Sequence, residues 1–443
     1  MYFTIMKNAI KIIKKLVDAG YQAVLAGGCV RDKLMNITPH DFDIATNASP
    51  DTVVNMFEKT IEVGKAFGVI VVMLDNTEYE VATFRADGEY SDGRRPDSVT
   101  FVTMEEDAQR RDLTINGMFL NPLTNELLDF VDGKKDLRKG VIRLIGDPGE
   151  RIEEDKLRMM RVARFATRFG FKIASRTMEA VKSHASEITQ VSSERVADEL
   201  VKILRLKNRA EGIRFLFRTK IIKHILPEVE GLQGVEQPPQ FHPEGDCLKH
   251  TLMALEALPE GSSDELLLGT LLHDIGKPAT FKIAERIRFD SHDKVGAHIA
   301  EDILKRLKFS NNTIERVVNL ITNHMKWMCV QKMRVSRLKR FIRQPFFEEH
   351  EALHRVDCIA SHGKLDNLAF VKAKKDSFPP EVIRPEPLIR GQQLIDTHFT
   401  PGPLFKEILQ KVEDEQLEGT VKTRGEAIKF VKDNFVSTKK ERV

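Results

Sequence analysis

The chain has 443 residues, too many for one hydrophobic core, and this length predicts roughly three or four domains. It is 41% hydrophobic and 30% charged, its net charge of +3 does not by itself indicate a nucleic-acid partner, and it has no apolar run near the roughly 18 residues of a membrane span. The four cysteines lie far apart without a Cys-x-x-Cys pair, so we expect a cytoplasmic protein with neither a disulfide framework nor a zinc site.

The first 145 residues are expected to form a small mixed α/β unit. Apolar side chains at helical spacing predict a helix over residues 7–19 that stops at Gly20. A second helix is expected to begin at Ser49-Pro50-Asp51, with Ser49 as its cap. Short strands are predicted at residues 21–26, 41–45, 68–74 and 79–85.

The segment Gly27-Gly28-Cys29-Val30-Arg31-Asp32 follows the first predicted strand and is expected to be a glycine turn that opens a helix. Such a turn lets backbone N–H groups approach a triphosphate. In Asp41-Phe42-Asp43-Ile44, polar and apolar residues alternate, so a strand would place both carboxylates on one face. Two such carboxylates could share two divalent ions about 3.5–4 Å apart, as metal-dependent nucleotidyl transfer requires. A turn that happens to contain two aspartates is the alternative.

Two further segments could contact a nucleotide. The adjacent arginines of Arg110-Arg111-Asp112 suit the β- and γ-phosphates, and Asp112 could orient them or bond a ribose hydroxyl. The polar, glycine-containing stretch of residues 84–96 is expected to be a mobile loop, which could close over a substrate or have no function.

From Asp147 to about residue 226 the periodicity predicts helices throughout. On one helix, Asp155 and Arg158 would lie one turn apart and face the same way, either as a plain ion pair or as a base-reading pair. A carboxylate accepts and an arginine donates, which matches the pairing edges of cytosine and adenine and rejects guanine and uracil. Arginines recur three or four residues apart on this helix and would form a basic stripe of Arg158, Arg161, Arg164 and Arg168.

Residues 228–245 are predicted to be a linker, followed by a second helical block to about residue 376. A proline-rich break over residues 378–387 precedes a short helical tail, in which Thr423 and Glu426 form a capping-box signature.

Nine of the thirteen histidines lie between His242 and His362. The adjacent His273 and Asp274, at the end of an apolar helix, offer an imidazole and a carboxylate to one divalent ion. His250 and Asp357 could complete this set. Candidates for a second ion are His292, His298 and His324, although the pattern around His298 also fits an ordinary helix face. His242, on the linker, could contact a substrate or have no role.

The motifs of the first half, taken in chain order, resemble those of a known family. The order Gly-Gly-x-Val-Arg-Asp, Asp-x-Asp, Arg-Arg-Asp, Glu-Asp-x-x-Arg and Ser-Glu-Arg over residues 20–225 resembles the class II tRNA nucleotidyltransferases and bacterial poly(A) polymerases. Together with a resemblance of the histidine-rich half to the HD superfamily of metal-dependent phosphohydrolases, this implies an α+β protein whose mixed α/β head is polymerase-β-like and whose neck, HD domain and tail are helical. The implied domains are a nucleotidyltransferase head at 1–145, a neck at 146–227, an HD domain at 228–376 and a tail at 377–443.

The resemblance also implies roles for the motif residues. Asp41 and Asp43 would be the catalytic ligands of Mg²⁺ in the head, and Asp155 and Arg158 would select CTP or ATP, positioned by Glu154. The other implied nucleotide-binding residues are Gly27, Gly28, Arg31, Asp32, Arg110, Arg111, Asp112, Arg161 and Arg164.

The histidine-rich half resembles the HD superfamily of metal-dependent phosphohydrolases. This implies an ion held by His250, His273, Asp274 and Asp357, either a transition metal such as Ni²⁺ or Mn²⁺, or Mg²⁺. The resulting prediction is an enzyme that adds CCA to tRNA from CTP and ATP, with an HD phosphoesterase activity and no membrane partner.

Three alternatives remain open. An A-adding enzyme would keep the same motifs, and a poly(A) polymerase usually lacks the HD half. An RNA-binding regulator would have a catalytically inactive head, although the intact Asp41 and Asp43 argue against it. The segment 85–96 resembles the flexible loop of the family, which argues against an enzyme that adds only cytidines.

Overall fold

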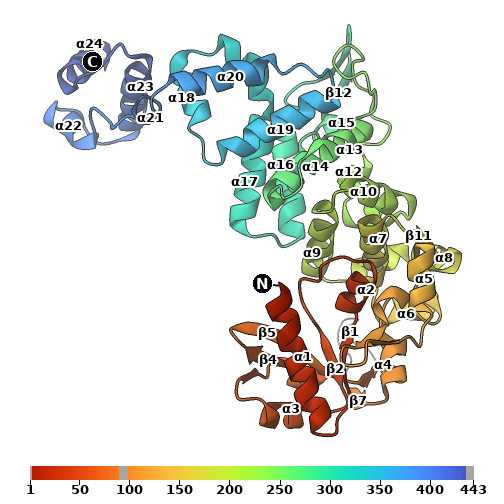
Figure 1. Ribbon diagram of the computed structural model, residues 1–443. Coiled ribbons are helices and arrows are strands. Elements are labelled where there is room, and N and C mark those ends of the chain that lie inside the picture. Colours follow the sequence, from red (N-terminus) through yellow and green to blue (C-terminus); the bar gives the residue numbers. More distant parts are fainter. Residues whose placement is uncertain (1, 89–97, 436–443) are drawn as a thin grey trace. The chain divides into compact units, whose positions relative to one another are not determined.

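The computed structural model describes residues 2–88 and 98–435, and the chain forms two compact units (Figure 1). The first unit comprises residues 1–231, 260–264 and 302–310, and the second comprises 232–259, 265–301 and 311–443. No helix in the described ranges is long and apolar enough to cross a bilayer.

The first unit is built on a seven-stranded mixed sheet with the strand order β3-β4-β5-β2-β1-β8-β9. Strand β1 pairs antiparallel with β2, bringing Leu25 opposite Ile44, and β2 pairs parallel with β5. The strands are β1 (Ala23–Ala26), β2 (Ile44–Thr46), β3 (Thr60–Ile61), β4 (Val69–Leu74), β5 (Thr77–Thr83), β8 (Phe119–Asn121) and β9 (Glu126–Leu128).

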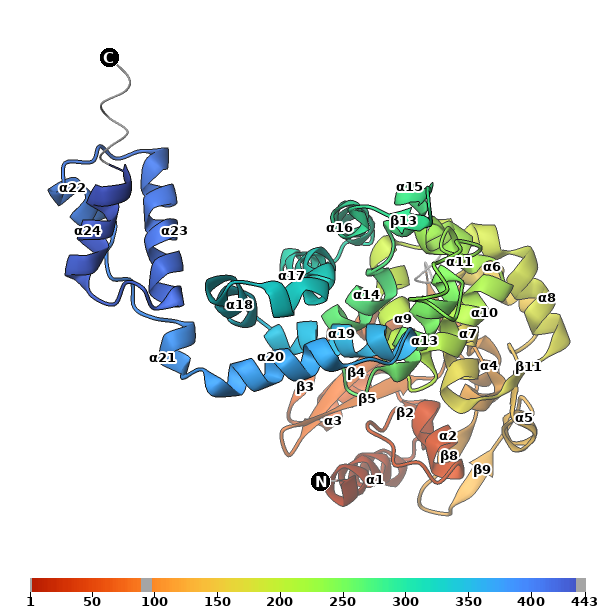
Figure 2. The same cartoon turned by 90° about the horizontal axis from the view of Figure 1, so that it is seen from above.

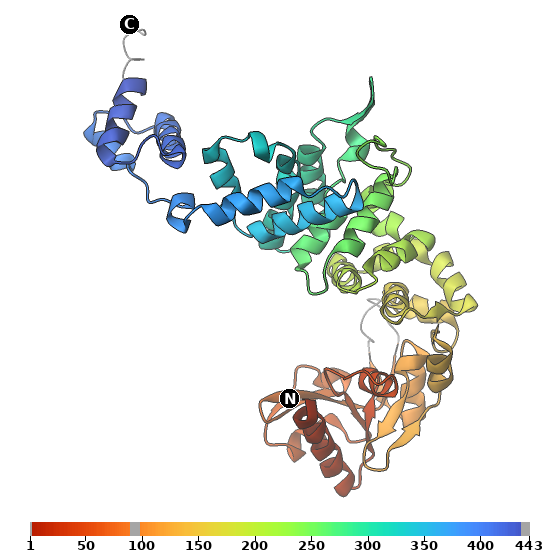
Figure 3. The ribbon, with the colours of Figure 1, turned by 45° about the horizontal axis from the view of Figure 1, so that its top comes forward.

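Helix α1 (Tyr2–Asp18) lies against this sheet (Figure 3). Its side chains Ile12, Ile13 and Leu16 are buried in one core with Leu25 and Ile44, which explains the helical spacing of its apolar residues. The predicted helix over 7–19 is therefore confirmed, although it begins earlier, at Tyr2. The remaining elements of this part are α2 (Gly28–Leu34), α3 (Pro50–Met56), η1 (Lys65–Phe67), β6 (Arg85–Asp87), β7 (Val99–Phe101), α4 (Met104–Arg110), η2 (Thr114–Asn116), α5 (Gly133–Lys139) and β10 (Val141–Ile142).

Two of the local sequence predictions for this unit are confirmed. Ser49 caps α3 by accepting a hydrogen bond from the Thr52 N–H at 3.2 Å. Gly27 ends the strand segment and precedes α2 with φ 71°, a backbone conformation that residues with a side chain rarely adopt. Most of the predicted loop over 84–96 lies outside the described residues, while Arg85–Asp87 forms β6.

The helical part of the first unit contains a break that the sequence did not reveal. Helix α6 ends at Glu154 and α7 begins at Arg158, with Asp155 in an extended conformation between them, so the expected single helix through Asp155 and Arg158 is wrong. The Asp155 carboxylate accepts from the Leu157 N–H at 3.0 Å, a local hydrogen bond that competes with helix continuation. The elements are α6 (Pro148–Glu154), α7 (Arg158–Phe169), β11 (Lys172–Ile173), α8 (Ser175–Ser183), η3 (Ala185–Gln190), α9 (Ser193–Leu204), α10 (Arg209–Arg218), α11 (Ile221–Ile225) and α12 (Pro227–Glu230).

The second unit is mainly helical, and α13 packs against α19 at its centre. Two helices contribute residues to both units, because Asp264 of α14 and the segment 302–306 of α16 belong to the first. The elements are α13 (Cys247–Ala257), α14 (Asp264–Leu272), α15 (Lys277–Thr280), β12 (Phe281–Ile283), β13 (Ile287–Phe289), α16 (His292–Arg306), α17 (Asn311–Asn323), η4 (His324–Lys332), α18 (Val335–Ile342), α19 (Phe347–Ala360) and α20 (Asp366–Ser377).

The C-terminal helices α22, α23 and α24 pack together around a small core that includes Leu394, Ile408 and Val431 (Figure 2). The predicted capping box is confirmed, since Thr423 Oγ1 accepts from the Glu426 N–H and Glu426 Oε2 accepts from the Thr423 N–H. The helices of this segment are α21 (Pro380–Ile383), α22 (Gly391–Asp396), α23 (Pro403–Glu418) and α24 (Arg424–Phe435).

Gly276 marks a close approach between two backbones of the second unit. A Cβ atom there would lie 2.3 Å from the His292 carbonyl oxygen and 2.6 Å from the Gly296 nitrogen, neither of which can rotate away. We expect Gly276→Ala to destabilise the protein by about 1–3 kcal/mol, seen as a lower midpoint in thermal unfolding without added metal. The control Gly425→Ala, whose Cβ would meet nothing nearer than 4.0 Å, should leave the midpoint nearly unchanged. Equal midpoints for the two variants would contradict the close approach.

Candidate functional site

A cleft of about 620 Å³ in the first unit collects nearly all the residues that the motifs singled out. Among the described residues, each predicted nucleotide-binding or catalytic residue of the head and neck lines it, except Arg164. The lining residues are Gly27, Gly28, Arg31, Asp32, His40, Asp41, Asp43, Arg85, Arg110, Arg111, Asp112, Asn116, Asp155, Arg158, Arg161, Phe165 and Arg168.

Asp41 and Asp43 lie at one wall of the cleft, immediately before β2 rather than within it as predicted. The Asp43 carbonyl nevertheless accepts from the Ala26 N–H of β1 at 3.0 Å, and the intervening Phe42 is buried. Burial and the nearby charge of Asp41 raise the pKa of Asp43 to about 6. Two carboxylates that repel each other in this way fit a hard divalent cation such as Mg²⁺, which would relieve the repulsion.

The glycine turn is connected to the helical part by charged side chains. Arg31 donates to Asp32 Oδ1 at 2.8 Å and to Asn116 Oδ1 at 2.5 Å. The second Asp32 oxygen accepts from Arg168 of α7 at 3.3 Å. The Arg31 guanidinium also lies 5.2 Å from the ring centroid of Phe165. These contacts fix the direction in which Arg31 faces the cleft.

The arginine pair and Asp112 do not orient one another, contrary to one expectation. Arg110 and Arg111 both pair with the buried Asp107, at 2.8 and 3.0 Å, whereas Asp112 pairs with Arg161 at 2.7 Å. Burial alone would raise the pKa of Asp112, but the charge of Arg161 and a hydrogen bond from Asn116 hold it below its usual range. Asp107 was missed by the sequence analysis, although it lies three and four residues before the arginines.

Asp155 and Arg158 face the same cleft but are held by different partners. Asp155 Oδ2 accepts from Arg195 at 2.8 Å, and Arg158 donates to Glu154 Oε2 at 2.5 Å. No ion pair joins Asp155 to Arg158 in the described part of the chain, so the plain ion-pair alternative is wrong. Glu154 thus contacts Arg158 directly, and its positioning role stays a prediction.

The half-buried Arg195 and the buried Glu199 were missed as parts of this network. Arg195, from the Ser-Glu-Arg motif, holds Asp155, and Glu199 of α9 pairs with Arg164 at 2.7 Å. The Arg164 guanidinium also stacks 4.3 Å from the Phe165 ring centroid. Arg164 therefore supports the wall of the cleft rather than facing into it.

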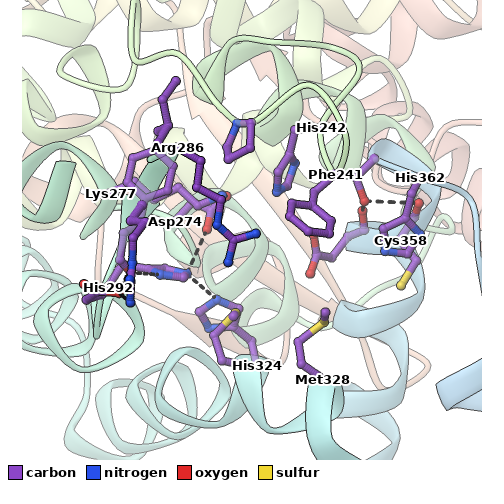
Figure 4. A pocket seen from close by; sticks show the side chains of 18 of the residues that line it. Phe241, His242, Asp274, Lys277, Arg286, His292, His324, Met328, Cys358 and His362 are labelled. Atoms are coloured by element: carbon purple, nitrogen blue, oxygen red, sulfur yellow. Dashed lines mark hydrogen bonds and ion pairs between the residues drawn. The ribbon is translucent and has the colours of Figure 1, made fainter. Parts of the chain in front are cut away.

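A second candidate site lies in the second unit, where histidines and aspartates from several helices converge (Figure 4). Three groups of possible metal ligands occur among the described residues, and within each group the ligand atoms lie within 4.8 Å of one another. The first group is His250, His273 and Asp357, the second is Asp274, His292 and His324, and the third is His242, Glu244 and His250. The four residues predicted to hold one ion therefore converge, since Asp274 Oδ2 also lies 3.3 Å from His273 Nε2.

The outward-facing nitrogens of the first histidine group have fixed partners. His273 Nδ1 faces the Thr270 carbonyl at 2.8 Å, and His250 Nδ1 faces Glu244 Oε1 at 2.7 Å. This arrangement leaves both Nε2 atoms directed toward the centre, as metal-ligating histidines require. Burial by itself would lower the pKa of His250, but hydrogen bonds with Asp357 and Glu244 raise this pKa to about 9. A bound cation would take the place of the added proton.

Lys277 and His242 complete the surroundings of the cluster. Buried Lys277 donates to Asp274 Oδ2 at 2.7 Å, and the charge of Asp274 raises the lysine pKa although burial acts against it. His242 shares Glu244 with His250 and lines the pocket. His298, by contrast, has an exposed side chain outside the ligand groups of the described residues, as an ordinary helix face predicts.

The cluster opens into a pocket of about 370 Å³ that combines cationic and apolar walls. Arg286 contributes its guanidinium, 5.6 Å from the ring centroid of Phe241, and Phe289, Met325 and Met328 supply apolar surface. Figure 4 shows His292 between Asp274 and His324 in the wall of this pocket. Such a pocket suits a phosphate group attached to a partly apolar body.

Known proteins resemble this chain along most of its length. Family models match it as "Poly A polymerase head domain" over residues 23–143, "Probable RNA and SrmB- binding site of polymerase A" over 170–232 and "HD domain" over 247–350. The CCA-adding enzyme of Ligilactobacillus salivarius is 32% identical over 418 residues, covering 94% of this chain and 93% of that protein.

Two further relatives match this chain, one over about half of its length and one over nearly all of it. The CCA-adding enzyme of Bacillus pumilus is 44% identical over 224 residues, but the match spans only 56% of its length and 50% of this chain. The crystal structure of the Bacillus stearothermophilus CCA-adding enzyme in complex with CTP has a TM-score of 0.76 and 26% identity, covering 98% of both chains.

Proposed function

The chain belongs to the family of CCA-adding enzymes, which are tRNA nucleotidyltransferases, and we propose how its cleft performs their reaction. It adds C, C and A to the 3′ end of tRNA from CTP and ATP without a nucleic-acid template. The observation that carries this proposal is the cleft itself, in which the Asp41–Asp43 pair, the arginines and the Asp155–Arg158 pair line one space.

Asp41 and Asp43 would hold divalent cations. The expected ion is Mg²⁺, because the two carboxylates offer only oxygen ligands. Those ions would supply activation of the tRNA 3′-hydroxyl and neutralisation of the triphosphate. Arg31, Arg110 and Arg111 bind the phosphates by charge-assisted hydrogen bonds, with Asp32 and Asp107 fixing their orientation. The 3′ oxygen forms a bond to the α-phosphorus, the bond to the bridging oxygen breaks, the hydroxyl proton passes to water, and pyrophosphate leaves.

Asp155 and Arg158 would read the base. The carboxylate accepts from the amino group of cytosine or adenine, and the guanidinium donates to the neighbouring ring acceptor. Because Arg195 and Glu154 hold the two side chains separately, the acceptor and the donor are positioned before the nucleotide arrives.

We expect Asp155→Ala to weaken the preference for CTP and ATP over GTP and UTP by roughly 10-fold to 100-fold, because one correct base contact is worth about 1–3 kcal/mol. Competition among the four nucleotides on one tRNA transcript would measure it. Asp198→Ala, on the exposed surface of α9, is the control and should keep wild-type selectivity. Full selectivity in Asp155→Ala would contradict the base-reading role.

The experiment that tests the whole assignment uses three tRNA transcripts that end before CCA, after C and after CC. Addition of C and A in order to all three is the expected result. Addition of A alone, to the transcript ending in CC, would instead show an A-adding enzyme. Long tracts of A on unrelated RNA would show a poly(A) polymerase.

For the second unit we propose a metal-dependent phosphohydrolase site. His250, His273, Asp274 and Asp357 would hold a divalent ion, and their mixed nitrogen and oxygen donors suit Mn²⁺ or Ni²⁺ better than Mg²⁺. Such an ion would supply a hydroxide nucleophile and polarise a phosphoryl oxygen. Lys277 and Arg286 would bind the remaining phosphate oxygens.

Phosphate ends that block nucleotide addition, such as 2′,3′-cyclic or 2′-phosphates, are the substrates that fit this combination of activities. Hydrolysis adds water across a P–O bond, so that phosphorus gains the hydroxyl and the leaving oxygen gains the proton. Incubation with Ni²⁺, Mn²⁺ or Mg²⁺ should convert one of these ends, and failure with all three ions would overturn the assignment.

The proposed domains follow the predicted boundaries: a head at 1–145, a neck at 146–227, an HD domain at 228–376 and a tail at 377–443. The matched family segments at 23–143 and 247–350 fall within the head and the HD domain, and the segment at 170–232 overlaps the neck but runs five residues past its boundary. The separate core of α22–α24 supports the tail. A cytoplasmic location is part of the proposal, supported by four cysteines that are unpaired in the described chain.

A further inference from the structure

The pocket of the second unit contains an aromatic side chain that neither proposed activity uses. Phe241 lines this pocket (Figure 4) and is 42% exposed. It lies in the turn before α13, where its backbone N–H donates to the Pro238 carbonyl at 3.0 Å. An aromatic residue that stays exposed in the lining of a pocket offers ring surface to whatever the pocket binds.

A guanidinium without an acidic partner lies beside this ring. Arg286 has its guanidinium carbon 5.6 Å from the Phe241 ring centroid, and it forms no ion pair in the described part of the chain. Its neighbour Arg288, by contrast, pairs with Asp290 at 2.9 Å. A guanidinium is planar and permanently charged, so Arg286 could lie against a flat ring and also attract an anionic group.

His354 presents a buried polar group to the same pocket. It is 4% exposed, and its ring stacks on Trp327 with the centroids 4.5 Å apart and the planes at 6°. Among the described residues, the hydrogen-bond partner of its two nitrogens is the Cys358 thiol alone, at 3.6 and 3.7 Å. Because a thiol is a weak donor and a weak acceptor, this imidazole retains hydrogen-bonding capacity for a bound molecule.

These three groups match the chemistry of a nucleoside. A nucleobase is flat, stacks on aromatic rings and guanidinium planes, and carries donors and acceptors along its edge. An aliphatic body would leave the polar nitrogens of His354 without a better partner, and a sugar phosphate without a base would leave the Phe241 ring unused. The pocket volume of about 370 Å³ is in the range that holds a small organic ligand.

We propose that this pocket contains a nucleoside subsite, in which Phe241 stacks on the terminal base of an RNA 3′ end and His354 hydrogen-bonds to the polar edge of that base. This inference rests on the proposed phosphohydrolase, whose centre would bind the phosphate of the same nucleotide. Phe241 and His354 would contact the nucleoside rather than the phosphate. They would therefore determine which phosphoesters the site accepts, by favouring those attached to a base.

The test measures binding to the full-length protein without added metal, so that no ester is hydrolysed. Trp327 is the only tryptophan of the chain and stacks on His354, so its fluorescence reports on this pocket. Adenosine 2′-monophosphate should change this emission, and Phe241→Ala and Phe241→Leu should weaken its binding by about 5-fold to 100-fold, as expected for the loss of one stacked base. Phe241→Tyr should bind like the parent protein.

Two controls accompany these variants. Glycerol 2-phosphate has no base, and it should bind more weakly than adenosine 2′-monophosphate and equally in all variants. Phe346→Ala replaces an equally exposed phenylalanine outside the pocket and should leave both affinities unchanged. Thermal unfolding checks that each variant is folded. An emission that adenosine 2′-monophosphate does not change, or equal affinities for it in the parent and Phe241→Ala, would overturn the inference.

Hydrolysis of the same two phosphoesters with Mn²⁺ separates this inference from the proposed activity. Binding that depends on Phe241 without hydrolysis of either ester would leave the subsite standing and remove the phosphohydrolase. Hydrolysis of both esters at equal rates, in the parent and in Phe241→Ala alike, would do the reverse.

Discussion

Asp43→Asn is expected to abolish nucleotide addition, lowering its rate by roughly 10³-fold or more. The substitution keeps the size of the side chain but removes the half-buried charge that would hold a cation. Metal stabilisation of a transition state is worth several kcal/mol, and each 1.36 kcal/mol corresponds to about tenfold in rate. Single-turnover incorporation of CTP into a tRNA transcript measures the loss directly.

The control is Asp51→Asn, in which an exposed aspartate of α3 loses its pairing with Lys65. It should retain full activity, because Asp51 lies outside the residues that line the cleft. Phosphoester hydrolysis by Asp43→Asn should also remain, since the HD residues are unchanged. Nucleotide addition at the wild-type rate would instead favour an RNA-binding regulator with an inactive head.

The reciprocal change, Asp357→Asn, is expected to lower phosphoester hydrolysis by about 10²-fold or more and to spare nucleotide addition. Asp357 Oδ1 lies 3.1 Å from His250 Nε2, so an amide there removes one anionic ligand from the proposed centre. Loss of several kcal/mol of transition-state stabilisation corresponds to this range. Release of the 2′,3′-cyclic phosphate and incorporation of CTP are measured on the same preparation.

Asp357 is a better position at which to test hydrolysis by substitution than the pair His273 and Asp274. Removing Asp274 would leave buried Lys277 without its carboxylate partner, and breaking a buried pair typically costs about 3–5 kcal/mol. Lost activity would then be confounded with unfolding. Asp366→Asn, at the exposed start of α20, is the matched control and should hydrolyse normally. Normal hydrolysis by Asp357→Asn would remove that residue from the site.

Local features of this protein could be derived from neighbouring residues. The cap at Ser49, the apolar face of α1 and the capping box of α24 each depend on residues within a few positions of one another. The family likeness came from the order of the motifs. Even the convergence of His250, His273, Asp274 and Asp357 was anticipated, because their residue types suit one metal ion.

The tertiary structure decided which charges pair and where the helices break. Asp155 is held by Arg195, forty residues away, rather than by the nearby Arg158, and Asp112 pairs with Arg161 rather than with its neighbouring arginines. Side-chain spacing along a helix predicts contacts three or four residues apart, but pairs between elements depend on how those elements pack. The sequence by itself thus determined the chemical groups of both sites, and only packing determined their partners, because burial makes an unpaired charge too costly to remain.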